Sequence, residues 1–363
     1  MRRLHFETLN PVCPQCRHSR GISSPLVLAK IIRGTEDDVV EGHLHCTDPS
    51  CFLEFPIIDG IPILVPDARK YISDNWHHIT AREDFSADIE STLGDCIGPG
   101  TAFDATRQHL STYSWDHYAD LDPQEPESQE QQQAGAIIKC LDYAVNKTES
   151  CWQGPVIDAG CSVGRTTFEL AQITKKPVLG IDLNFSMLRL AQKILRERKV
   201  SYPRRRIGVV YDRREFEVNF EEIEQVDFWA CDAQTLPFND DSVTALTAFN
   251  LIDCVPSPLS FLTEIARIVE TDGTAIIATP YDWSPHATSM EQWIGGHSQR
   301  GPDKGSAEPF IRALLTPGAH PQSITGLELV EGINNLAWQT RLHDRCTVNY
   351  RVDLLLVRAR NSK

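Results

Sequence analysis

Four cysteines in the first 51 residues have the spacing of a metal site. Cys13 and Cys16 form a Cys-x-x-Cys pair, and Cys46 and Cys51 form a second, wider pair further along the chain. Zinc prefers four soft ligands in a tetrahedron, and two tight turns that each carry two thiolates can close such a shell. We therefore expect a structural zinc ion, because four protein ligands leave no open position for chemistry.

Two alternatives to a four-cysteine zinc site stay open. His43 and His45 flank the second pair and are substitute ligands, although the cysteines are favoured. The second alternative is that the four cysteines are reduced thiols buried in an ordinary core, but their arrangement in two close pairs makes this less favoured. The segment from Phe55 to Arg69, FPIIDGIPILVPDAR, resembles the small zinc-binding partner proteins that activate methyltransferases and their bacterial relatives. This resemblance covers roughly residues 10 to 70 and implies a folding and docking role, with a protein partner for the module.

A glycine-bearing turn from Val156 to Ala171, VIDAGCSVGRTTFELA, is the second chemical motif. Gly160 and Gly164 let the backbone bend sharply and approach a ligand, and the helix that follows presents its N-terminus to an anion. Such a loop by itself also fits nucleotide dehydrogenases. Asp158 to Gly164, however, resembles the D-x-G-x-G-x-G pattern of class I methyltransferases, with Ser162 at the middle glycine.

Three further motifs follow in the order of that family: VLGIDLN, FWACDAQTLPF and FNDDSVTALTAFNLID. The resemblance covers about residues 135 to 360 and implies S-adenosylmethionine as cofactor, with Asp182 accepting the ribose hydroxyls and the Asp232 region contacting adenine. Alternatives are that Asp182 only caps a helix and that the neighbours of Asp232 contact adenine instead. The predicted cofactor-binding residues are Asp158, Gly160, Cys161, Ser162, Gly164, Arg165, Asp182, Leu183, Asp232, Ala233 and Asn250.

The substrate side is predicted from two strand ends, NLID (Asn250 to Asp253) and TPYDW (Thr279 to Trp283), which should flank the crevice where ligands bind in such sheets. Together with EQWIGG, Glu291 to Gly296, they resemble the methyltransferase domain of ovothiol synthases, which methylate a thiohistidine imidazole. The resemblance implies N-methylation of a small amino-acid-derived or imidazole-type molecule, although those enzymes carry no zinc module in front of this domain. The predicted catalytic and substrate-lining residues are Asp253, Tyr281, Asp282 and Trp283.

Other aromatic and basic residues each have two interpretations. Trp283 and Trp293 fit core packing as well as a substrate pocket. Tyr113, Trp115 and Tyr118 fit either a lid or the core. The stretch Tyr202 to Phe216 holds Arg204, Arg205, Arg206, Arg213 and Arg214. A solvated face paired to acidic residues is favoured for it over an anion site.

The secondary-structure pattern around these residues predicts an α/β fold. Short β-rich runs alternate with helical segments after about residue 135, which predicts a parallel, Rossmann-like sheet of seven strands behind a small β-rich zinc module. Predicted strands are 156–159, 178–182, 226–232, 243–250 and 274–279, with an antiparallel pair at 327–332 and 348–358. Predicted helices are 165–172, a helix capped by Ser186, and 258–269. The predicted domains are 1–70 (zinc module), 71–134 (connecting or lid segment with an exposed linker at 122–133) and 135–363.

Charge and composition narrow the function. The chain of 363 residues has a net charge of −15, which would repel nucleic acid and favours a small-molecule substrate. The eleven cysteines and the absence of a long apolar run predict a cytoplasmic protein without a membrane segment. Alternatives are a ribosomal or transfer RNA methyltransferase with a zinc knuckle, and a non-catalytic methyltransferase-like partner protein.

Overall fold

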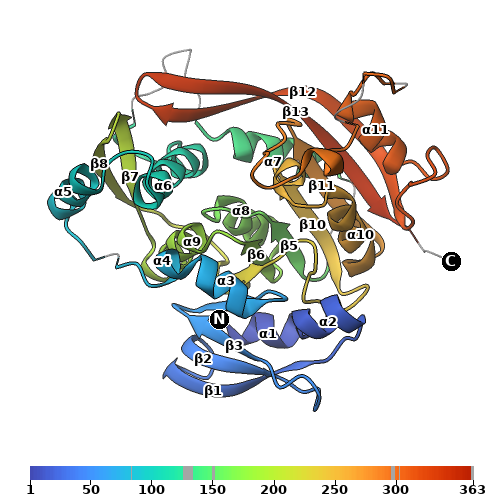
Figure 1. The fold of residues 1–363 in the computed structure, drawn as a ribbon, viewed down its shortest axis with the longest axis horizontal. Helices are drawn as coiled ribbons and strands as arrows, with labels where there is room; N and C mark the ends of the chain where they lie inside the picture. The colour runs from blue at the N-terminus through green and yellow to red at the C-terminus, as the bar shows by residue number, and fades with distance from the viewer. Residues whose placement is uncertain (83, 126–133, 149–151, 296–298, 302, 361–363) are drawn as a thin grey trace.

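One mixed sheet of eleven strands organises the computed structural model, which describes residues 1–82, 84–125, 134–148, 152–295, 299–301 and 303–360 (Figure 1). Seven of its strands run in the order β9-β6-β5-β10-β11-β13-β12. Neighbours from β9 to β11 are parallel, while β13 is antiparallel to both β11 and β12. The predicted seven-stranded α/β sheet is therefore confirmed. The strands are β5 Val156–Ala159, β6 Val178–Asp182, β9 Val226–Cys231, β10 Val243–Phe249, β11 Val269–Thr279, β12 Leu327–His343 and β13 Cys346–Ala359.

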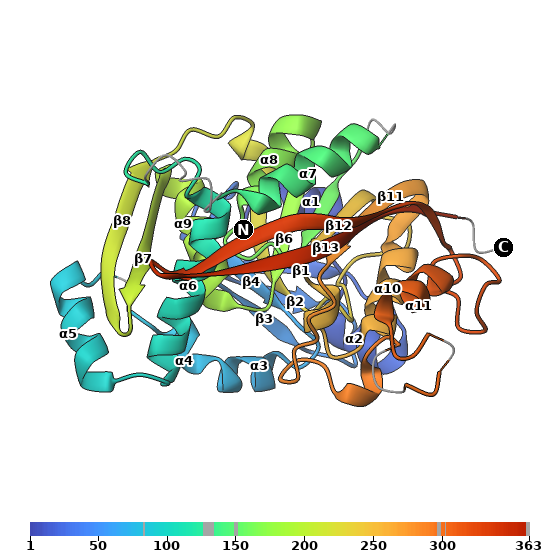
Figure 2. The same ribbon diagram turned by 90° about the horizontal axis from the view of Figure 1, so that it is seen from above.

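Helices cover both faces of this sheet, because successive residues of its central strands are buried on opposite sides. Val178 of β6 belongs to one hydrophobic cluster and the next residue, Leu179, to the other. The first cluster holds α7 (Ala136–Lys147), α8 (Arg165–Thr174) and α9 (Phe185–Glu197). The second holds α10 (Pro258–Ile268) and α11 (Ala307–Leu314), and Figure 2 shows the two layers from above. The crevice outside the carboxyl ends of β5, β6 and β10 is where the strand order reverses.

The cap of α9 differs from the prediction. Asn184, and not Ser186, is the N-cap, because its side chain accepts a hydrogen bond from the backbone N–H of Met187 at 3.3 Å. Ser186 already lies inside the first turn, where its hydroxyl contacts His78 Nδ1 at 3.0 Å. The helix therefore begins directly after the turn that follows β6.

The N-terminal residues extend the same sheet. They form α1 (Arg3–Leu9), α2 (Pro14–Arg20) and four antiparallel strands, β1 (Leu26–Gly34), β2 (Val39–Cys46), β3 (Glu54–Ile58) and β4 (Ile61–Leu64). β4 pairs in parallel with β9, with Ile63 opposite Ala230, and this module lies beside the larger sheet in Figure 1. Cys13 and Cys16 share a hydrophobic cluster with Trp229 of β9. The predicted domain boundary at residue 70 falls within α3 (Ala68–Asp74).

Three helices and a β-hairpin lie at one end of the molecule, on the left of Figure 1. The helices are α4 (Trp76–Ile79), α5 (Ala87–Ile97) and α6 (Ala102–Tyr118), and the hairpin is β7 (Lys199–Ile207) with β8 (Val210–Glu217). Single 3-10 turns occur at Ile223–Gln225, Ile252–Cys254 and Met290–Gln292. Of the predicted linker 122–133, residues 126–133 lie outside the described part. The prediction that Asp122 is exposed was wrong. Its side chain is buried, and its Oδ2 lies 3.1 Å from Nε of Arg214.

The hairpin contains the basic stretch, and its arginines are paired to acidic side chains or carbonyl oxygens. Arg204 and Arg206 both reach Asp344, and Arg214 also approaches Glu125 at 3.5 Å. Arg213 pairs with Glu90, and Arg205 donates to Gly208 O and Gln108. This pattern agrees with the favoured interpretation of paired arginines. Along the described part of the chain, no helix is both long and apolar enough to cross a bilayer.

Candidate cofactor, substrate and metal sites

The four predicted metal ligands meet at one point of the N-terminal module. Each Sγ of Cys13, Cys16, Cys46 and Cys51 lies within 4.8 Å of the other three. Cys13 and Cys51 are separated by 3.8 Å and Cys16 and Cys46 by 3.6 Å. A zinc ion with Zn–S bonds of about 2.3 Å would hold tetrahedral sulfurs about 3.8 Å apart, so the cluster has the size that this ion needs.

Groups around the cluster suit thiolate ligands. Arg20 donates to Cys16 Sγ at 2.8 Å, and the backbone N–H of Asp48 donates to Cys46 Sγ at 3.4 Å. Donors of this kind stabilise negative sulfur and orient metal ligands. His45 pairs instead with Glu54 at 3.1 Å, and the four-residue group contains neither His43 nor His45. The histidines therefore lie beside the cysteine set.

The loop after β5 bends through three positive φ angles, at Gly160 (+72°), Ser162 (+52°) and Gly164 (+89°). The backbone N–H of Gly160 binds Ile181 O at 2.8 Å, which ties the loop to β6. A Cβ on Gly164 would lie 2.7 Å from the ring of Phe228, so this glycine is required by packing of the loop on β9. Gly164 therefore has a packing role, and its predicted part in approaching the cofactor stays a prediction.

Asp158 and Arg165 support this loop through protein contacts. Asp158 is buried and accepts hydrogen bonds from the hydroxyls of Thr166 (2.5 Å), Thr167 (2.7 Å) and Thr247 (2.8 Å). Arg165 pairs with Asp120 at 3.0 Å and with Glu169 at 2.8 Å. Both side chains are buried, and these contacts position the loop; their predicted part in cofactor binding stays a prediction. Cys161 is buried beside them.

Asp182, at the end of β6, faces the same loop. Its carboxylate accepts the backbone N–H of Ser162 at 2.9 Å and that of Asn184 at 2.8 Å. Burial raises the pKa of Asp182, although the N–H groups of Asn184 and Ser162 oppose the shift. Each oxygen keeps a further lone pair for hydroxyl donors. The carboxylate thus joins two loops and retains capacity for a diol.

The predicted residues on the neighbouring strand ends lie at the same edge of the sheet. Asp232 follows β9 and accepts from Gln234 N at 2.9 Å, while Ala233 is buried. Leu183 remains 40% exposed, so it can form one wall of a ligand site. Asn250 follows β10 with a φ of +53°, and its buried Oδ1 has no hydrogen-bond partner among the described residues.

Tyr71 is a residue of this site that the sequence did not reveal. It lies on α3, and its hydroxyl donates to Leu183 O at 2.8 Å. Burial, followed by the nearby charge of Asp182, raises the pKa of Tyr71 well above its usual range. A segment next to the zinc module therefore contacts the loop predicted to hold the cofactor. No local sequence pattern connects a tyrosine at position 71 to a turn at 183.

Asp253 lies in the 3-10 turn Ile252–Cys254 that follows β10, and it is 2% exposed. Its Oδ2 accepts the backbone N–H of Asp282 at 2.8 Å, and its Oδ1 has no hydrogen-bond partner among the described residues. Burial, followed by the charge of Asp282, raises the pKa of Asp253 to about 6. Such a carboxylate changes protonation near neutral pH, which is where a proton acceptor is most effective.

Two tyrosines from distant segments lie near the carboxylates at this edge of the sheet. Burial and then the carboxylates of Asp282 and Asp253 raise the pKa of Tyr350, on β13. Tyr113, on α6, keeps 43% of its surface exposed, yet burial raises the pKa of its hydroxyl, followed by the charges of Cys254 and Asp182. The three aromatic residues differ in burial: Trp115 and Tyr118 are buried and belong to the core, whereas Tyr113 is exposed and its part in a lid stays a prediction. Tyr350 was not predicted.

The remaining predicted substrate residues lie along the loop after β11. Tyr281 has a φ of +56° and donates to Asp353 at 3.3 Å. Trp283 stacks on Trp293 with ring centroids 6.3 Å apart, and Trp293 Nε1 donates to Thr288 O at 3.0 Å. Both tryptophans thus pack on each other and on the loop. Gly296 of the EQWIGG motif lies outside the described residues.

Comparisons with known proteins agree with this geometry. Residues 157–277 match the family model described as "Methyltransferase domain". An uncharacterized chloroplastic methyltransferase of Arabidopsis thaliana is 27% identical over 164 residues, which cover 41% of this chain and 46% of that protein. The chain therefore spans less than half the length of this curated relative.

Solved structures that match this chain have low similarity to it. A chain of the complex between the Haloferax volcanii Trm112 methyltransferase activator and a putative methyltransferase is 17% identical, with 61% of this chain and 89% of that chain covered and a TM-score of 0.38. A SAM-dependent methyltransferase of Methanosarcina mazei is also 17% identical, with 60% of this chain and 97% of that chain covered and a TM-score of 0.39. Residues 157–277 thus match a methyltransferase domain, and the strand order and the bend of the loop after β5 are those of a Rossmann-like methyltransferase fold.

Proposed function

We propose that this chain is an enzyme that transfers the methyl group of S-adenosylmethionine to a nitrogen atom of a small amino-acid-derived molecule, of the imidazole type. The observation that carries the proposal is Asp253, whose buried carboxylate keeps one oxygen without a partner among the described residues. Its pKa of about 6 leaves it charged at neutral pH. A carboxylate of this kind can hold an N–H group of the acceptor and take its proton.

The residues that would hold the donor are those around the turn after β5. Asp182 would accept the ribose hydroxyls, and Leu183 with Ala233 would form walls for the adenine. S-adenosylmethionine supplies a methyl group on a positively charged sulfur. Transfer of that group is an in-line displacement, so the protein contributes alignment and exclusion of water more than chemical groups.

Tyr113, Tyr281 and Tyr350 would form the aromatic and hydroxyl surroundings of the acceptor. Aromatic faces bind flat rings and positive charge. Asp282 adds a second, exposed carboxylate beside Asp253, so the site has negative charge and no cationic side chain among the residues named for it. This composition favours a neutral or cationic amine or imidazole over an acidic acceptor.

We also propose that Cys13, Cys16, Cys46 and Cys51 hold one zinc ion in a structural role. All four positions of a tetrahedral shell would be filled by thiolates, so no position would remain for substrate. The module would then stabilise the pairing of β4 with β9 and the contact of α3 with the turn after β6, which carries Asp182 and Leu183. In this arrangement the chain's own methyltransferase domain is the partner of the module.

The acceptor class can be identified with purified protein and methyl-labelled S-adenosylmethionine. The protein is incubated with cell extract that has been separated into metabolite, protein and RNA fractions, and an Asp253→Asn variant serves as control. We expect label in the metabolite fraction and, within it, on imidazole-bearing molecules. Label in the RNA fraction would instead support an RNA methyltransferase. Binding of the donor without labelling of any fraction would support a non-catalytic partner.

A further inference from the structure

A second cavity lies on the opposite side of α9 from the sheet, away from the site described above. It has a volume of about 520 Å³ and is lined by residues of α5, α6, α9, the β7–β8 hairpin, the stretch 76–82 and Phe85. A cavity of this volume is within the range of small-molecule sites, roughly 300–1,000 Å³. Phe85, Phe103, Leu110 and Leu190 supply apolar walls.

The charged groups of this cavity are strongly unequal in sign. Five cationic side chains line it, against a single carboxylate, Glu90. The five are Arg82, Arg107, Arg189, Lys193 and Arg213. The chain as a whole carries a net charge of −15, so a concentration of positive charge around one apolar cavity runs against its average composition. Such a field attracts anions and repels cations.

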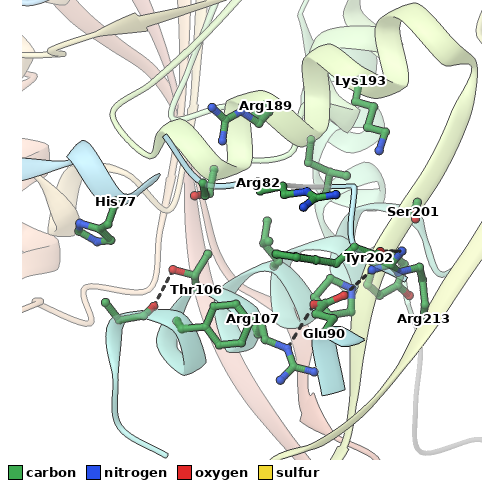
Figure 3. A pocket seen from close by; sticks show the side chains of 18 of the residues that line it. His77, Arg82, Glu90, Thr106, Arg107, Arg189, Lys193, Ser201, Tyr202 and Arg213 are labelled. Carbon is green, nitrogen blue, oxygen red and sulfur yellow. Dashed lines mark hydrogen bonds and ion pairs between the residues drawn. The ribbon is translucent and has the colours of Figure 1, made fainter. Parts of the chain in front are cut away.

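Glu90 is already occupied. Arg107 approaches its Oε1 at 3.3 Å, and Arg213 pairs with its Oε2, as Figure 3 shows. Arg107 also stacks over the ring of Tyr211 at 3.9 Å, which holds its guanidinium in place. The carboxylate of Glu90 therefore offsets part of the positive charge of Arg107 and Arg213. Within the part of the chain that the structure describes, it forms no ion pair with the other three cations of the cavity.

Lys193 is the group that remains available. Arg189 pairs with Asp59 at 3.0 Å, and Arg82 pairs with Asp84. Lys193 is half-buried, and within the described ranges of the chain it forms neither a hydrogen bond nor an ion pair. It also borders a shallower hollow that contains Asp84 and Glu197, yet pairs with neither. In Figure 3 its side chain extends from α9 toward the cavity.

We propose that this cavity is a second small-molecule site, which binds a ligand with an apolar or aromatic body and one anionic group. The body would lie against Phe85, Phe103 and Leu110, and the anion would pair with Lys193. This ligand class differs from the amine or imidazole proposed for the catalytic site. The two sites meet near the start of α9: Ser186, in the first turn of this helix, lines the cavity, and Asp182, the last residue of β6, lies four positions before it.

The test uses 8-anilinonaphthalene-1-sulfonate, an aromatic anion whose fluorescence rises in apolar surroundings, with the full-length protein. We expect one saturable site that persists when the protein is saturated with S-adenosylhomocysteine. The uncharged analogue N-phenyl-1-naphthylamine should bind at least roughly tenfold more weakly, because it cannot form the charge-assisted contact. Displacement by S-adenosylhomocysteine, equal binding of the uncharged analogue, or no saturable binding would each overturn the proposal.

Matched variants locate the site. Lys193→Ala should weaken the sulfonate about tenfold, while Lys193→Arg should retain affinity within about threefold because it keeps the charge. Lys147→Ala removes a lysine from α7, where it pairs with Glu331, and should leave binding unchanged. Unfolding midpoints of all three variants should equal that of the parent. Unchanged binding by Lys193→Ala contradicts the assignment.

Discussion

Asp253 combines burial, one fixed oxygen and one oxygen without a partner among the described residues. Its pKa is raised to about 6, so the carboxylate is available as a proton acceptor above that pH and is lost as the pH falls through it. We expect kcat/KM to decline below about pH 6. Asp253→Asn should lower kcat by about 10²-fold and abolish this acidic limb, because an amide cannot take the proton. Asp241→Asn, an exposed carboxylate at the start of β10, is the control and should behave as the parent.

A substitution of Asp282 tests independently whether Asp253 is the group that titrates in the acidic limb. Its charge is one cause of the raised pKa of Asp253, so Asp282→Asn should move the acidic limb of kcat/KM to lower pH. The hydrogen bond from the backbone N–H of residue 282 to Asp253 would be kept. A limb that stayed in place would mean that another group titrates in the reaction.

At the scale of the elements, α3 connects the N-terminal module to the donor loop through Tyr71. Its hydroxyl donates to Leu183 O at 2.8 Å. Tyr71→Phe removes this one hydrogen bond, which is worth about 0.5–1.5 kcal/mol, and should weaken donor binding roughly threefold to tenfold. Tyr143→Phe, on the exposed side of α7, is the matched control. Equal affinities of the two variants, measured by calorimetry, would show that the contact does not order the loop.

The sequence predicted the central strands closely, because their buried runs are bounded by turn residues. The predicted bounds of β5 and β6 equal those observed, and β9 and β10 end one residue earlier than predicted. The β7–β8 hairpin was missed, since its five arginines hide the alternation of buried and exposed positions. The pairing of β4 with β9 joins residues more than 160 positions apart, and no local pattern contains it.

For the site, as for the fold, the sequence predicted the residues that lie in local motifs and missed those brought in by tertiary contacts. Glycines and carboxylates at strand ends follow from short motifs, so Asp182, Asp232 and Asp253 were named. Tyr350 belongs to the crevice only because β13 returns antiparallel to β11, which places it near Asp282 and Asp253. Arg165 was named from its place in the glycine motif, but one of its ion-pair partners, Asp120, comes from the turn after α6, some 45 positions away in the chain. Tertiary contacts of this kind cannot be seen in one sequence.

At the scale of the whole molecule, the cysteine module and the methyltransferase domain share one sheet and one hydrophobic cluster. We expect the purified protein to contain one zinc per chain and to unfold in a single thermal transition. Cys46→Ser should lose the metal and lower the whole transition by roughly 10 °C, because zinc binding contributes directly to folding. Cys140→Ser changes a buried cysteine outside the cluster and should keep the metal. Two separate transitions, of which only one responds to the metal, would contradict this coupling.

The central claim is that the turn after β5 and Asp182 together hold S-adenosylmethionine. Calorimetric titration of the purified protein with this donor and with S-adenosylhomocysteine tests it most directly. We predict binding at one site, and a loss of at least roughly tenfold in affinity for Asp182→Asn, since a carboxylate that accepts hydroxyl donors contributes about 1.5–3 kcal/mol. Asp241→Asn should bind as the parent does. If the parent protein showed no heat of binding for either compound, the methyl-transfer account would be contradicted.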